Sequence, residues 1–159
     1  FTVELWATLD HLSPGQVLLD SRTESGQGVC LQTSRRETVE IVLNDGRTEN
    51  RWACDPGHLE AGRKHHIIVT VDGGPRIITF IVDGKLCDGG AFRQFGWGRF
   101  SPNLRHANGD TTLRIGPNLD GRIHRLRIYT RRLRTSEAVG NYHAGASAGP
   151  EPRLERSMQ

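Results

Sequence analysis

The greatest concentration of residues able to bind a ligand lies in the segment 92–108. Four aromatic residues fall within nine positions there, and arginine, glutamine, histidine and asparagine residues lie between and after them. Aromatic faces stack on the C–H surfaces of sugars, while planar guanidinium and amide groups hydrogen-bond sugar hydroxyls. The glycines on either side of Trp97 would let a ligand approach closely. We therefore predict a ligand-binding loop, whose contact residues are Trp97, Arg99, Asn103, Arg105 and Asn108, with Trp52 as a second aromatic platform.

A structural interpretation of the same loop stays open. Large aromatic residues are mostly buried in folded proteins. Phe92, Phe95, Trp97 and Phe100 could therefore fold back and close one end of the domain. The sequence does not decide between these two interpretations.

Glycosidic hydrolysis would need two carboxylates on one face of a strand, two or four residues apart. Glu37 and Glu40 are three residues apart and would point to opposite faces. Glu151 and Glu155 have the right spacing, but they stand in a charged, proline-containing C-terminal segment. We therefore predict that the chain is not an enzyme.

Metal binding has two groups of candidates. His65 and His66 are neighbours on a predicted strand, so they point to opposite faces and cannot chelate one ion together. Calcium needs several oxygen ligands converging from loops. Aspartates at turns also serve turn geometry, so the candidates have a structural alternative. The candidate calcium ligands are Asp45, Asp83, Asp110 and Asp120.

The three cysteines, Cys30, Cys54 and Cys87, allow at most one internal disulfide and leave one thiol over. None of them forms the C-x-x-C spacing of a zinc or redox site. Cysteine usage therefore leaves both the disulfide state and the redox compartment open.

The net charge of +3 includes an arginine cluster in the segment 122–134. A basic cluster can bind a polyanion, and it can equally be a solvated sheet face. No aromatic-basic signature of an RNA-binding domain and no recognition helix is present, so we expect no nucleic-acid partner. We also expect no membrane span, because no apolar run approaches the roughly 20 residues that one needs.

Alternating apolar residues predict strands over most of the chain. Two segments rich in β-branched residues, 66–71 and 77–82, flank an Asp-Gly-Gly-Pro sequence and should form a hairpin. Another strand is expected at 122–129, with a bulge or two covered faces at Ile123, which is out of phase. A short helical turn capped by Thr135 or Ser136 should end before Gly145. We expect one domain over 1–145 and a flexible tail over 146–159.

Several motifs follow one another in a distinctive order. They are the strand at 1–6, the strand and Asp-Gly turn at 62–73, the turn at 81–85, and the closing segments 113–116, 120–123 and 126–129. In this order they resemble the laminin-G-like domains of the concanavalin-A-like lectin/glucanase superfamily over residues 1–143. Members usually carry a strand ahead of the segment that begins this chain, so we expect the first strand to be missing or supplied by a neighbour.

The resemblance implies an all-β fold: a jelly-roll sandwich of two antiparallel sheets. It also implies an extracellular or periplasmic setting, calcium in some members, and a role beside a carbohydrate-active enzyme. Our leading hypothesis is a non-catalytic, lectin-like module of a larger secreted protein, with a glycan or polysaccharide as partner. The alternatives are a structural domain that packs against a neighbouring domain or chain, and a polyanion-binding domain that uses the arginine cluster.

Overall fold

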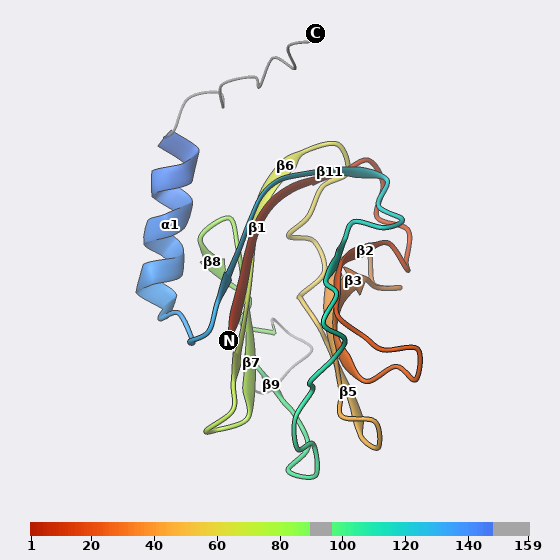
Figure 1. Cartoon of the computed structure of the whole chain (residues 1–159). Coiled ribbons are helices and arrows are strands. Elements are labelled where there is room, and N and C mark those ends of the chain that lie inside the picture. Colours follow the sequence, from red (N-terminus) through yellow and green to blue (C-terminus); the bar gives the residue numbers. More distant parts are fainter. Residues whose placement is uncertain (90–96, 148–159) are drawn as a thin grey trace, which may run out of the picture.

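The computed structural model describes residues 1–89 and 97–147, and it is a sandwich of two antiparallel sheets with one helix against its side (Figure 1). One sheet has the order β11-β1-β6-β7-β8, and β9 also pairs with β7. The other sheet has the order β10-β2-β3-β4-β5. The expected all-β jelly-roll sandwich is confirmed.

The first sheet is built around β1 (Thr2–Leu9) and β6 (Lys64–Asp72). Their neighbours are β7 (Ile77–Val82), β8 (Lys85–Leu86), β9 (Gly98–Arg99) and β11 (Gly121–Tyr129). The hairpin expected between the segments 66–71 and 77–82 is confirmed, since β6 pairs with β7 from Ile67–Val82 to Asp72–Ile77. Period-two alternation places Val3, Leu5 and Ala7 in the core and the residues between them on the outer face.

The second sheet contains β2 (Val17–Asp20), β3 (Gly28–Thr33), β4 (Val39–Asn44), β5 (Glu49–Ala53) and β10 (Arg114–Ile115). Leu31, Ile41 and Leu43 face the first sheet and are almost completely buried. The β4–β5 hairpin turns at an Asn-Asp-Gly sequence, where Gly46 adopts a φ of 89°. The apolar core therefore lies between the two sheets.

The predicted irregularity in the last strand is a bulge. Trp6 pairs with Arg125 and Ala7 pairs with Ile123, so His124 is the extra residue. The bulge puts Ile123 and Leu126 on the same face, where both pack against the core. His124 Nε2 lies 2.9 Å from Thr8 Oγ1 on the outer face.

Helix α1 (Thr135–Ser147) covers the outer face of the first sheet (Figure 1). It is longer than the expected turn and continues past Gly145, because Gly145 packs closely against the ring of Trp6 and need not act as a stop. Residues 148–159, the larger part of the expected tail, lie outside the described residues. Among those described, no helix has the length and apolarity needed to span a membrane.

Candidate functional site

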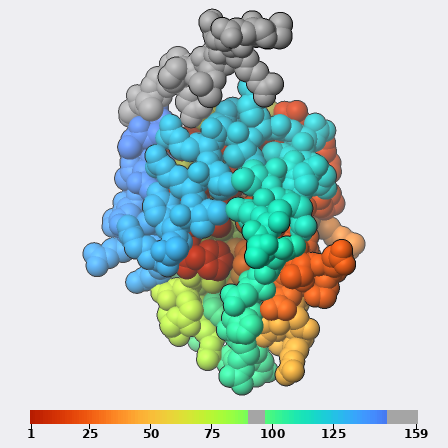
Figure 2. All heavy atoms as spheres, in the orientation of Figure 1, coloured from red at the N-terminus to blue at the C-terminus, as the bar shows by residue number. Residues whose placement is uncertain are grey.

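The loop that follows β9 crosses from the first sheet to the second. It begins beside β7, where Phe100 N donates to Arg76 O at 3.1 Å. It then runs along the β4–β5 hairpin, where Ser101 N donates to Asn50 Oδ1 and Arg105 N donates to Asp45 Oδ2 at 2.8 Å. Figure 2 shows this segment as a green-to-teal ridge on the surface between the two hairpins. The tethers therefore fix the loop across the opening between the sheets.

A pocket of about 440 Å³ lies beneath this loop. Its apolar part includes Phe1 and Phe100, both half-buried, and its polar part is supplied by Arg76, Arg105 and His106, all exposed. We call this site the loop pocket. It joins aromatic surface to planar nitrogen groups, which is the combination that sugar recognition uses.

A second, more apolar pocket of about 340 Å³ lies beside the first. Phe1 and Ala107 line both pockets, while Asn108 lines only the second. The other contacts of the second pocket are mostly aliphatic; they include Leu19, Val29, Leu113 and Ile128.

Asp45 is the acidic group that anchors the loop next to the pocket. Its carboxylate accepts the backbone N–H groups of Arg47, Thr48 and Arg105 at 2.7–2.9 Å. These hydrogen bonds, with that of Arg105 contributing most, lower the pKa of Asp45 to about 2. Its negative charge is therefore directed at the main chain that it holds.

Arg76 has an unusual backbone conformation for its residue type. Its φ of 58° lies in the left-handed region, which non-glycine residues adopt at a cost of about 1–3 kcal/mol. The preceding Pro75 fixes its own φ near −65° and helps to define this turn. The turn places Arg76 in the lining of the pocket.

The structure separates the residues proposed from the sequence into three groups. Arg105 lines the loop pocket and Asn108 lines its apolar neighbour. Trp97, Arg99 and Asn103 are exposed and line neither of these pockets. Phe92 and Phe95 lie outside the described residues.

Trp52 occupies a packed position. It is half-buried, points toward the core from β5, and lies against the backbone of Gly98. A Cβ atom at Gly98 would stand 2.2 Å from Trp52 Cδ2. The ring therefore supports β9 from below.

The four aspartates proposed for calcium have separate partners. Asp83 Oδ2 accepts from His65 Nδ1 at 2.6 Å, and Asp120 Oδ2 lies 2.6 Å from His11 Nε2. Asp45 holds the loop, and Asp110 accepts weakly from Thr112 N at 3.4 Å. In the described part of the chain, none of the four belongs to a group of three or more acidic, histidine or cysteine ligands.

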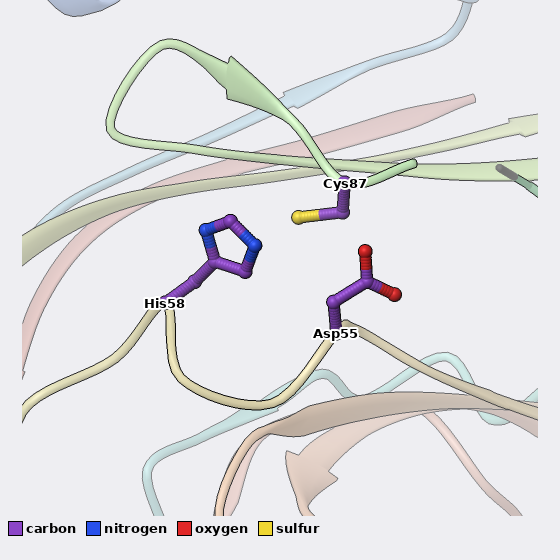
Figure 3. Close-up of side chains that lie close together, drawn as sticks. All are labelled: Asp55, His58 and Cys87. Atoms are coloured by element: carbon purple, nitrogen blue, oxygen red, sulfur yellow. The ribbon is translucent and has the colours of Figure 1, made fainter. Parts of the chain in front are cut away.

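Three other side chains that could ligate a metal ion converge between the end of β5 and the end of β8. Asp55, His58 and Cys87 each present one donor atom, and these atoms lie within 4.8 Å of one another (Figure 3). Cys54 adds a second thiol, with its Sγ 3.2 Å from Cys87 Sγ. Asp55 also accepts Gly89 N–H at 2.7 Å.

Sequence reasoning missed Phe1 and Arg76 as pocket residues. They come from the first strand and from the β6–β7 turn, far in sequence from the loop. An arginine directly after a Gly-Gly-Pro turn sequence was the available signal, because that position often needs a left-handed φ.

The family model of the concanavalin A-like lectin/glucanases superfamily matches residues 1–139. The chain belongs to this superfamily, which confirms the resemblance that its motif order indicates. A search of curated protein sequences finds no match to the chain.

Solved structures show the same fold at low sequence identity. The Ruminococcus gnavus IT-sialidase CBM40 bound to alpha2,3 sialyllactose has a TM-score of 0.65 and 14% identity, with 89% of this chain and 80% of that chain covered. The binding domain of botulinum neurotoxin serotype D has a TM-score of 0.67 and 16% identity, with 90% and 36% covered. The heptameric SAP-like pentraxin from Limulus polyphemus has a TM-score of 0.52 and 15% identity, with 87% and 67% covered.

Proposed function

We propose that this chain is a non-catalytic glycan-binding module of a larger extracellular or periplasmic protein. The observation that carries the proposal is the loop pocket, where Phe1 and Phe100 adjoin Arg76, Arg105 and His106. The IT-sialidase domain of the same fold, which is bound to a sialylated sugar, supports this choice of ligand class.

The charges around the pocket favour a glycan that carries an anionic group. Arg76 and Arg105 supply two permanent positive charges, and the pocket lining contains no acidic residue among those described. An arginine side chain binds a carboxylate or sulfate through two parallel hydrogen bonds. The strained backbone of Arg76 also supports a binding role, since such strain concentrates at ligand sites.

The test is a glycan array that includes sialylated, uronate-containing, sulfated and neutral sugars, followed by calorimetry on the best binder. We expect an anionic glycan to bind, and Arg105→Ala to weaken it about tenfold or more, because a charge-assisted hydrogen bond contributes about 1.5–3 kcal/mol. Arg76→Gly suits the left-handed backbone and removes the guanidinium alone.

Arg99→Ala is the matched control, because Arg99 is exposed on β9, directly before the loop, and does not line the pocket. It should change the affinity less than twofold. Equal losses for Arg99→Ala and Arg105→Ala, or binding to no glycan on the array, would contradict the proposal. Binding that depends on Trp97 alone would move the site to the outer side of the loop.

A second candidate function is attachment to a neighbouring domain or chain. Within the described residues, β10 and β11 each pair on one side only. Three large apolar residues near these edges are exposed: Leu113 by 38%, Ile115 by 53% and Ile128 by 50%. Exposed apolar residues beside an unpaired strand favour contact with another polypeptide.

Sedimentation of the chain over a wide concentration range, with and without its natural neighbouring domains, tests this candidate. We expect association that Ile115→Glu abolishes. Lys85→Glu, which changes an exposed strand residue far from these edges, is the control. A monomer under all of these conditions would rule the candidate out.

A further inference from the structure

We propose that Cys54 and Cys87 form a disulfide bond that joins the two sheets between the ends of β5 and β8. The Sγ atoms of these residues lie 3.2 Å apart, which is closer than two non-bonded sulfur atoms normally approach. The two residues come from different sheets, since Cys54 follows β5 and Cys87 follows β8. The bond would stand whether or not the loop pocket binds a glycan.

The main chain holds both cysteines in place. Cys54 N donates to Val39 O at 2.7 Å, and Cys87 N donates to Phe80 O at 3.0 Å. Both side chains are almost completely buried, with 1% and 3% exposed. Only a small movement of the two sulfur atoms is then needed to bring them to bonding distance.

Burial makes the paired thiols a poor site for thiolate charge. Contact with Cys87 and desolvation both raise the pKa of the Cys54 thiol. A disulfide carries no charge and needs no hydrogen-bond partner, so it fits this buried position between the sheets.

Figure 3 shows the competing chemistry, in which Asp55, His58 and Cys87 would hold a metal ion. The Asp55 carboxylate already accepts a hydrogen bond from Gly89 N–H, in the segment that follows β8. Structural zinc usually takes four protein ligands, whereas this group supplies three and omits Cys54. The 3.2 Å separation of the two sulfur atoms therefore favours the disulfide.

The bond forms by thiol–disulfide exchange with a disulfide oxidant of the export pathway. One thiolate attacks the oxidant and forms a mixed disulfide, and the second thiolate displaces the oxidant's sulfur. The two cysteines lose two protons and two electrons, and the oxidant is reduced to two thiols. The product closes a loop between positions 33 residues apart in the chain.

The first test counts free thiols in the exported wild-type protein, alkylated in denaturant without reductant and weighed intact. We expect one alkyl group on the wild type, none on Cys30→Ser and two on Cys54→Ser. Cys30 is the matched control, because it is equally buried but lies in the second sheet away from the pair. Digestion should yield one linked peptide pair, which contains Cys54 and Cys87.

Three alkyl groups on the wild type would overturn the proposal, and so would a linked pair that contains Cys30. Stoichiometric zinc, together with three alkylated cysteines after chelation, would assign the site to metal instead.

The second test needs no variant to fold. Reductant should lower the melting temperature of the wild type by about 10 °C, given the entropy of a loop of this size. Cys30→Ser should keep this sensitivity. A melting temperature that reductant leaves unchanged would contradict a structural disulfide.

Discussion

Two segments cover the sandwich, and they are attached in opposite ways. Helix α1 is held by side chains that are buried against the first sheet, whereas the loop after β9 is held mainly through its backbone N–H groups. Ala138 of the helix is completely buried, and Tyr142 stacks on Trp6 of the sheet. Backbone tethering fixes the loop, whose apolar side chains Phe100 and Leu104 are half-buried against the core, while Arg105 and His106 stay exposed at a pocket. The difference separates a structural covering from a candidate binding surface.

The helix covers a buried polar network on the outer face of the first sheet. Glu4 is 2% exposed, and its carboxylate contacts His66 Nε2 at 2.9 Å and accepts from Tyr129 Oη at 2.6 Å. Asn141 of the helix also donates to Glu4, at 3.3 Å. Beside this network, Trp6 stacks on Tyr142 of the helix with ring centroids 5.8 Å apart.

The largest expected effect comes from breaking this network with Glu4→Ala. Burial opposes ionisation of Glu4, but its hydrogen bonds with His66 and Tyr129 lower its pKa overall. Removing it leaves several buried groups without their partner, so we expect a loss of about 3–5 kcal/mol in the free energy of unfolding. Urea denaturation measures it. The control Glu60→Ala removes an exposed carboxylate and should cost less than about 0.5 kcal/mol.

Gly98→Ala should disturb the loop by pushing β9 away from Trp52. The added Cβ would overlap the packed indole ring, so we expect about 1–3 kcal/mol of destabilisation. Gly73→Ala is the control, because a Cβ there meets no atom within 4 Å. Thermal melts compare the two variants, and equal melting temperatures would show that Trp52 does not support the strand.

Two glycines of α1 test how the helix packs on the first sheet. A Cβ at Gly145 would lie 2.6 Å from Trp6 Cζ2, whereas a Cβ at Gly140 would meet nothing within 4 Å. Alanine favours a helix by about 1 kcal/mol over glycine. Gly140→Ala should therefore stabilise by about 0.5–1 kcal/mol, and Gly145→Ala should destabilise by about 1 kcal/mol after the clash is included. Two stabilised variants would mean that the helix does not pack on Trp6 as described.

The smallest effect is a pH dependence of the loop tether. Because folding lowers the pKa of Asp45 from 3.8 to about 2, its stabilising contribution is present above pH 3.8 and is lost as the pH falls toward 2. The hydrogen-exchange protection factor of Arg105 N–H should fall over this range by more than that of Asp110 N–H, which bonds to Ser21 O. Asp45→Asn should remove the difference between the two amides.

The sequence predicts the strands well because alternation and Asp-Gly turns are local signals. Even the bulge could be expected, since Ile123 breaks the phase of its strand. The extent of α1 could not, because a glycine near a helix end usually stops it, whereas here Gly145 lies against the ring of Trp6 and the helix continues to Ser147.

The candidate site was predicted less completely. The ligand-binding loop stays a prediction from composition, and two of its proposed residues, Arg105 and Asn108, line pockets. Trp52, proposed as a second aromatic platform, is half-buried against Gly98, a contact between strands of different sheets that no local pattern indicates. Phe1 and Arg76 reach the pocket only through the sheet topology, which no local pattern reveals.

The proposal that the loop pocket binds an anionic glycan is tested most directly by NMR. The ¹⁵N-labelled chain is titrated with alpha2,3-sialyllactose, and with lactose as the neutral control. We predict changes in the amide chemical shifts of residues 73–76 and 100–107 with the sialylated sugar, and much smaller changes with lactose. The loop pocket is not the glycan site if the signals of these amides do not shift with sialyllactose or with other anionic glycans. Shifts that fall instead on the outer faces of the sheets would contradict it as well.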